Sequence, residues 1–149
     1  MHGVEDAATI ASVRAYVKLL RASRAVIAHT LPRLAEAGLT HTQLGVLEAV
    51  LHLGPLTQRD LTRKLLTSPG NLTDVIDKLT RRGLVERVVC KEDRRSVRVV
   101  LTEAGRSFIE NLFPGHAEDI AAAMAGVDRI ELAELDRLLR KLGQNVAKD

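Results

Sequence analysis

Two helix starts lie only eleven residues apart in the middle of this chain, and they limit strongly how it can fold. Thr57, with Asp60 three positions later, and Ser68, followed at once by Pro69, both have the residue pattern of a helix N-cap. A helix that begins after Thr57 can therefore extend for only about two turns before the next helix begins. The sequence predicts a short helix, a tight turn at residues 66–67 and a second helix.

The second of these helices is amphipathic and precedes a β-rich segment. Its apolar residues have the i, i+3, i+4, i+7 spacing of one helix face: Leu72, Val75, Ile76 and Leu79. Gly83 ends the helix, and strand patterns follow at residues 84–89 and 97–101, joined by a polar tip at 90–96. A short helix, a turn, an amphipathic helix and a hairpin are the elements of a winged helix-turn-helix, with the hairpin as its wing.

Helices with apolar stripes are also predicted before this region. In the first, apolar residues recur three and four positions apart: Ile10, Val13, Val17, Leu20, Ile27 and Leu31. We expect this helix to end between Pro32 and Gly38. A new helix is expected to start at Thr40, where Gln43 completes a capping box. The buried stripe of the new helix is formed by Leu44, Leu47 and Leu51.

Two more helices are predicted after the hairpin. Thr102 caps the first, and Pro114-Gly115 is expected to kink or interrupt it before it resumes as far as Met124. The last helix starts at about Asp128. We expect it to bury four leucines: Leu135, Leu138, Leu139 and Leu142.

These elements fit a mainly α (α+β) chain with one domain over residues 1–149. We expect a winged helix-turn-helix lobe at residues 40–106, flanked by dimerisation helices at 8–33 and 107–146. The apolar stripes of the flanking helices are too extensive for so small a lobe to cover. A second copy of the chain is a reasonable way to bury them.

Positive charge is concentrated in the predicted lobe. Residues 56–106 contain twelve lysines and arginines against seven aspartates and glutamates, whereas the rest of the chain has ten against twelve. Such a distribution favours a nucleic-acid partner. Aromatic residues make up only 2% of the chain and there is no tryptophan, so stacking platforms for single-stranded nucleic acid are hardly available. Double-stranded DNA is the better candidate.

Short polar side chains at the start of the second predicted helix are suited to a major groove, where they can bond to base edges or phosphates. Further along, Lys78 and either Arg81 or Arg82 are placed for phosphates. Nine residues of the two predicted helices are candidate DNA contacts: Thr57, Gln58, Ser68, Gly70, Asn71, Thr73, Asp74, Lys78 and Arg81.

The predicted wing tip carries Asp93, Arg94 and Arg95. An arginine on a hairpin tip can reach into a narrow minor groove, where the negative potential is enhanced. We expect Asp93 to orient one arginine through a bidentate pair. The alternatives are that these charges are only solvated, or that the winged helix is a module for protein assembly rather than DNA binding.

Several linked motifs resemble the MarR (multiple antibiotic resistance regulator) family over nearly the full length of the chain. LLTSPGNLT at 65–73 and RRGLVER at 81–87 are similar to the family's recognition helix and following strand, and DRRS at 93–96 and LTEAG at 101–105 to its wing tip and the junction after it. The resemblance implies a triangular homodimer that places two recognition helices in successive major grooves of a pseudo-palindromic operator. It also implies a transcriptional regulator. We expect repression, because a protein bound at a promoter blocks polymerase, with activation as the alternative, and we expect a small-molecule effector to release the DNA by favouring a different spacing of the two helices.

An effector site is expected near the first helix. Arg24 interrupts the apolar seam there, where a charge is costly unless it is paired or solvated. It can meet an anionic ligand, form an ion pair at the dimer interface or extend to the edge of the interface. The resemblance adds Tyr16, His29 and His41, because family members that sense small aromatic or phenolic compounds often bind them between the dimerisation helices and the wing lobe.

Other kinds of site find little support in the sequence. Cys90 lies beside Lys91, which can lower a thiol pKa, so a redox-responsive regulator is a further alternative. The family's peroxide sensors, however, carry their cysteine near the first helix. The histidines do not have metal-ligand spacing: His2, His29, His41, His52 and His116. We expect no metal, no cofactor, no enzyme activity and no membrane segment, and a cytoplasmic location.

Overall fold

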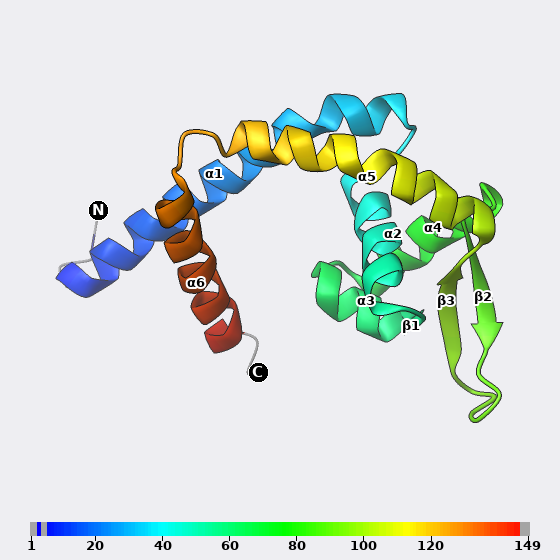
Figure 1. Cartoon of the computed structure of the whole chain (residues 1–149). Coiled ribbons are helices and arrows are strands. Elements are labelled where there is room, and N and C mark those ends of the chain that lie inside the picture. The colour runs from blue at the N-terminus through cyan, green and yellow to red at the C-terminus, as the bar shows by residue number, and fades with distance from the viewer. Residues whose placement is uncertain (1–2, 4–5, 147–149) are drawn as a thin grey trace.

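The computed structural model describes residue 3 and residues 6–146, and it joins a long helical platform to a compact lobe (Figure 1). The elements follow the order α1 (Ala7–Glu36), α2 (His41–Leu53), β1 (Leu56–Thr57), α3 (Gln58–Leu65), α4 (Pro69–Arg81), β2 (Val85–Val89), β3 (Val97–Leu101), α5 (Glu103–Ala123) and α6 (Arg129–Val146). Helices α1 and α5 lie side by side, and the lobe of α2 to β3 lies against one end of this pair (Figure 1).

The predicted short helix, turn and second helix are confirmed. The Thr57 hydroxyl accepts a hydrogen bond from the amide of Asp60 at 3.1 Å, and the Asp60 carboxylate accepts one from the amide of Thr57 at 3.3 Å. Ser68 caps α4 by accepting from the amide of Asn71 at 3.2 Å. Between the two helices Leu66 adopts a left-handed conformation with φ 49°, which turns the chain within three residues.

The predicted hairpin is present, within an antiparallel sheet of order β1-β3-β2. Val85 pairs with Leu101 at one end of the hairpin and Val89 with Val97 at the other. The third strand, β1, was not predicted. It has only two residues, and Leu56 pairs with Val99 of β3. A strand of this length is too short to show an alternating pattern in the sequence.

The core lies inside the lobe and extends to the platform. The apolar face of α4 is buried as predicted, and so are Leu44 and Leu47 of α2, whereas Leu51 is only half-buried. Leu34 of α1 and Ile109 of α5 belong to the same cluster. The platform and the lobe therefore share one continuous apolar core.

Of the two effects expected at Pro114-Gly115, an interruption is wrong, because helix α5 runs without a break from Glu103 to Ala123. Helix α5 packs against α1, and this packing supports the helix across the proline (Figure 1). The glycine serves this packing: a Cβ on Gly115 would lie 2.3 Å from Nη1 of Arg33. Its absence lets the Arg33 side chain cross α5.

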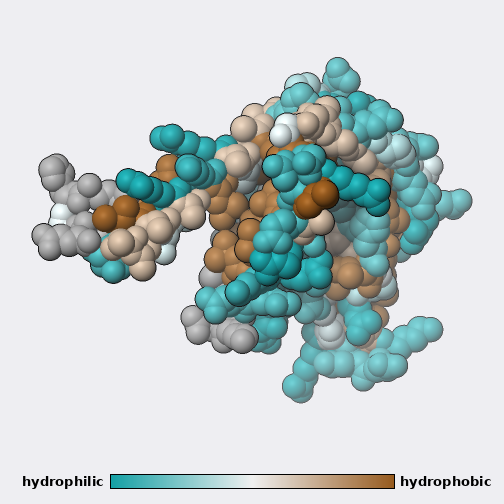
Figure 2. All heavy atoms as spheres, turned by 60° about the vertical axis from the view of Figure 1, so that its left-hand side comes forward, coloured by the Kyte–Doolittle hydropathy of each residue, from teal (hydrophilic) through white to brown (hydrophobic). Residues whose placement is uncertain are grey.

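The expected burial of the α6 leucines does not occur within a single chain. Leu138, Leu139 and Leu142 are exposed, and Leu135 is half-buried. The first half of α1 likewise exposes Val13 and Val17. Apolar atoms run along the projecting first half of α1 and over the surface beside it (Figure 2). Burial of these stripes would require surface that one copy of the chain does not supply.

Candidate nucleic-acid interface

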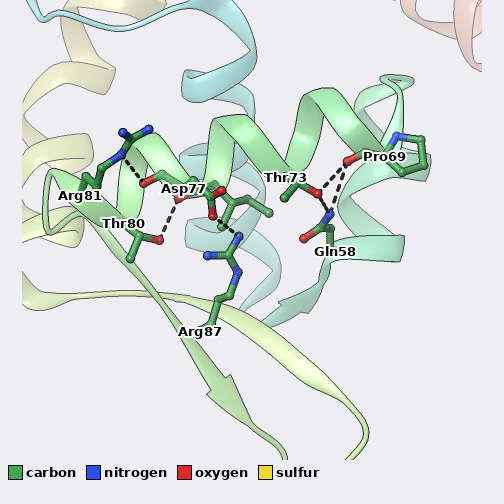
Figure 3. A network of polar contacts seen from close by, with 8 residues as sticks. Gln58, Pro69, Thr73, Asp77, Thr80, Arg81 and Arg87 are labelled. Atoms are coloured by element: carbon green, nitrogen blue, oxygen red, sulfur yellow. Dashed lines mark hydrogen bonds and ion pairs between the residues drawn. The ribbon is translucent and has the colours of Figure 1, made fainter.

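The polar face of α4 is exposed, as the sequence predicted, while its apolar face lies in the core. The start of α3 is fastened to it: the side-chain amide of Gln58 donates to the Thr73 hydroxyl and to the carbonyl oxygen of Pro69 (Figure 3). Two candidate DNA contacts from different helices, Gln58 and Thr73, are thereby brought together. The structure thus holds the first turns of α4 in place from outside the core.

Further hydrogen bonds fix the side chains on the first turns of α4. The Asn71 amide donates from Nδ2 to the Thr67 hydroxyl at 2.7 Å, and the Thr73 hydroxyl donates to the Pro69 carbonyl at 3.0 Å. These bonds limit the rotamers that the side chains adopt before any partner arrives. A surface whose side chains are already ordered loses less entropy when it binds.

Charged side chains occupy the second half of α4. Lys78 pairs with Asp74 at 2.8 Å, and both side chains are more than half exposed, so a phosphate can compete for the lysine. Asp77 pairs with Arg87 of β2 at 2.7 Å, and its backbone carbonyl accepts from Nε of Arg81 at 3.4 Å (Figure 3). The Asp77–Arg87 pair joins the wing to α4, and the sequence analysis missed it because the partners lie on different elements.

Arg82, the second sequence candidate for a phosphate, does not extend toward the polar face of α4. Its guanidinium group donates instead to the carbonyl oxygens of Gly38 at 2.7 Å and Ala37 at 3.1 Å. These atoms lie where α1 ends. Of the two alternatives, Arg81 is the one that remains on the polar face.

The wing tip exposes Arg94 and Arg95, as predicted, but Asp93 has a different part. Its carboxylate accepts from the backbone amide of Arg95 at 3.0 Å, and its carbonyl oxygen accepts from the amide of Ser96 at 2.9 Å. Asp93 therefore shapes the turn, as aspartate commonly does, and the expected bidentate pair with an arginine is not formed. Both arginines are therefore carried on a turn that Asp93 shapes.

Two cations that the sequence analysis passed over lie beside the start of α4. Arg59 and Arg63 of α3 are exposed and line a shallow hollow with Gln58, Thr62 and Pro69. They are four positions apart, so they share one face of the helix. The sequence shows this spacing, but it does not show that this face of α3 lies beside the start of α4.

The four effector candidates are not gathered within one chain. Tyr16, Arg24 and His29 all lie at exposed positions of α1, and His41 is the exposed first residue of α2. Tyr16 and His29 are separated by about 20 Å along the helix axis. One small molecule therefore cannot contact both of these residues of a single copy.

A buried polar junction joins the platform to the lobe. His116 of α5 is only 4% exposed, and its Nε2 lies 3.9 Å from Oε1 of Glu48 in α2. Its Nδ1 has no hydrogen-bond partner among the residues that the structure describes. Close by, the hydrogen bond from Arg33 holds the pKa of Asp119 below its ordinary value. From the sequence, His116 was considered only as a metal ligand, so its place at this junction was not predicted.

The described ranges, residue 3 and residues 6–146, also bear on metal binding, membrane insertion and thiol chemistry. They contain no group of three or more histidine, cysteine, aspartate or glutamate side chains that could hold a metal ion, and His2 lies outside them. None of their helices combines the length and the apolar character needed to cross a membrane. Cys90 is half-buried just after β2, where its amide donates to the Ser96 carbonyl at 2.9 Å.

Comparison with known proteins identifies the family. The MarR family pattern matches residues 37–96, from the end of α1 to the wing tip. The chain is 36% identical over 128 residues to the uncharacterized HTH-type transcriptional regulator YkoM of Bacillus subtilis (strain 168), a match that covers 86% of this chain and 83% of YkoM.

Solved structures with the same fold include two proteins with a known small-molecule ligand. One is BpsR of Bordetella bronchiseptica, whose DNA binding is regulated by 6-hydroxynicotinic acid (TM-score 0.78, 28% identity, 87% of this chain and 98% of that chain). Another is NadR in complex with 4-hydroxyphenylacetate (TM-score 0.72, 25% identity, 89% and 91%). Together with the sequence match, these similarities show that the chain belongs to the MarR family of transcriptional regulators.

Proposed function

We propose that this chain is a homodimeric repressor that binds double-stranded DNA sequence-specifically and that a small aromatic or anionic effector releases. The observation that carries the proposal is the exposed, already ordered polar face of α4, flanked by the arginines of α3 and of the wing tip. A regulator of this kind acts on the chromosome, so we expect it in the bacterial cytoplasm.

The proposed contacts divide by groove. The first turns of α4, with Ser68, Gly70, Asn71 and Thr73, enter the major groove and meet base edges, while Arg94 and Arg95 enter the adjacent minor groove. The remaining contacts position the protein on phosphates: Thr57, Gln58, Arg59, Arg63, Lys78 and Arg81. Asp74 keeps Lys78 in place until a phosphate takes over, and Asp93 shapes the wing turn.

The exposed stripes of α1 and α6 support the dimer. Exposed apolar residues lie on both helices: Val13 and Val17 on α1, and Leu138, Leu139 and Leu142 on α6. Monomeric proteins rarely expose large contiguous apolar surfaces. A second copy with two-fold symmetry would cover them with the same surface. We propose that the dimer holds its two recognition helices about 34 Å apart, which is one turn of DNA.

The proposed effector is a small aromatic compound with a carboxylate or phenolic group. Support comes from two proteins with the same fold: BpsR, which 6-hydroxynicotinic acid regulates, and NadR, which is bound to 4-hydroxyphenylacetate. Since Tyr16 and His29 are far apart in one chain, a site with both requires residues from two copies. Thermal melting with 6-hydroxynicotinate and 4-hydroxyphenylacetate as probes tests this idea; a rise in Tm that Arg24→Ala abolishes is the expected result.

DNA binding is tested with the duplex upstream of the chain's own gene, because family members commonly regulate their own or neighbouring genes. We expect a footprint and an affinity that falls steeply as salt rises, since each neutralised phosphate releases counterions. Transcription in vitro from the same promoter should decrease when the protein is added. Weak binding with a shallow salt slope and no footprint would remove the proposal.

A further inference from the structure

Arg82 connects the recognition helix to both helices of the platform. It is the C-cap residue of α4, and its two terminal nitrogens donate to the carbonyl oxygens of Gly38 at 2.7 Å and Ala37 at 3.1 Å. The carbon at the centre of its guanidinium group lies 5.3 Å from the centroid of the Phe108 ring in α5. One side chain therefore contacts the end of α1 and the first half of α5.

The two carbonyls are a favourable place for a fixed positive charge. Ala37 caps the C-terminus of α1, where the helix dipole is negative. The basic residue in the last turn of α1 itself is Arg33, but its guanidinium group is committed to Asp119. Arg82 supplies the positive charge at this helix end instead, although it lies 44 residues after Gly38 in the sequence.

The contacts of Arg82 are directional, so they restrict the tilt of α4, which the packing of its apolar face does not. Apolar packing holds α4 on the lobe but is not directional, so it tolerates small tilts. The planar fork of Arg82 contacts two oxygens and an aromatic face at once, so its contacts depend on the direction in which α4 lies. Because α4 has thirteen residues, it is about 20 Å long, and a tilt of about 10° around its C-terminal end would move its first turn by about 3 Å.

We propose that Arg82 is a positioning residue that fixes the angle between the recognition helix and the platform, and so sets the spacing of half-sites that the dimer accepts. This inference rests on the proposed function, because it requires an operator with two half-sites. Arg82 has no contact with DNA in this account. It acts through the position of the first turns of α4.

The test measures spacing selectivity. Operator duplexes are selected from random DNA with the wild-type dimer, and variants with one base pair inserted or removed between the half-sites are then compared. Selectivity is the ratio of Kd for the shifted spacing to Kd for the selected one. Arg82→Gln should reduce this ratio about tenfold, because the recognition helices are no longer held at one distance.

The neighbouring residue provides a matched control. Arg81→Gln removes the same charge from the same end of α4, but Arg81 is proposed to contact a phosphate. Its loss should weaken binding at every spacing and leave the ratio unchanged. An Arg82→Gln variant with the wild-type ratio would overturn the inference while the proposed function stands.

Two further outcomes are decisive. If Arg82→Gln does not fold, Arg82→Lys takes its place, because lysine keeps the charge but has no fork to span two carbonyls. A reduced ratio supports the inference, and a wild-type ratio overturns it. If the wild-type protein selects no DNA with two half-sites, the proposed function fails, and this inference fails with it.

Discussion

The guanidinium group of Arg33 donates to both carboxylate oxygens of Asp119, from Nε to Oδ2 at 2.6 Å and from Nη2 to Oδ1 at 3.1 Å. This pair fastens the last turn of α1 across α5. Gly115 makes it possible, since any larger residue there would occupy the path of the arginine. The platform is thereby held as one unit next to the buried junction of His116 and Glu48.

Acid should weaken this link. The hydrogen bond from Arg33 lowers the pKa of Asp119 from its ordinary value of 3.8, so the folded state favours the ionised carboxylate. Its contribution to stability is present above pH 3.8 and is lost as the pH falls through the lower folded value. Urea unfolding should show Asp119→Asn less stable than wild type at pH 7, with the difference vanishing in stronger acid.

The control is Asp136→Asn, which breaks the exposed pair with Arg140 on α6. It should change the free energy of unfolding less than Asp119→Asn at pH 7. An equal effect of the two variants would show that the Arg33–Asp119 pair has no special part in the platform.

Gly105 should tolerate no side chain. A Cβ at this position would lie 1.8 Å from the carbonyl oxygen of Leu84, which is backbone and cannot move aside. Gly105→Ala should therefore lower the free energy of unfolding by about 3 kcal/mol. Gly143→Ala is the comparison, because no atom lies within 4 Å of its added Cβ; stability there should stay the same or rise slightly. Chemical denaturation measures both, and a stable Gly105→Ala would refute the close approach.

Gly70 offers a separation of stability from DNA binding. Nothing lies within 4 Å of a Cβ built there, so Gly70→Ala should raise the free energy of unfolding by up to about 1 kcal/mol through better helix propensity. The same methyl group would keep the backbone of α4 away from DNA, and we expect affinity to fall about fivefold. Unchanged affinity would place Gly70 outside the interface.

The wing arginines should carry a measurable share of binding. Of Arg94→Ala and Arg95→Ala, at least one should weaken operator binding by about 1 kcal/mol and make the salt slope shallower. Arg140→Ala, a charge removed from α6, should leave both quantities unchanged. If neither wing variant differs from wild type in an anisotropy titration, the wing has no part in recognition.

The parts of the fold that were predictable depend on neighbours in sequence. The caps at Thr57 and Ser68 and the hairpin each require only a few consecutive residues, so local pattern was sufficient. Strand β1 was missed because its two residues are a strand only by virtue of pairing with β3. The expected interruption at Pro114-Gly115 was wrong because packing on α1 maintains the helix.

The candidate site shows the same division. Polar residues on one face of α4 followed from helical periodicity, and their local bonds four positions apart could be predicted in the same way. Two further bonds join separate elements and could not be predicted: Gln58 to Thr73, and Asp77 to Arg87. Arg82 had the sequence position of a phosphate contact, and only the fold shows that it turns toward α1. The apolar stripe of α6 followed from periodicity, but periodicity did not reveal that the stripe stays largely exposed within one chain.

The central claim is that two copies of the chain read two half-sites, and a footprint combined with stoichiometry tests it most directly. Hydroxyl-radical footprinting on the selected operator, with sedimentation of the same complex, measures the protected segments and the number of chains bound. We predict protection on one face of the duplex, in segments about one turn apart, by two chains. A monomer that binds a single half-site with the full affinity would contradict the account.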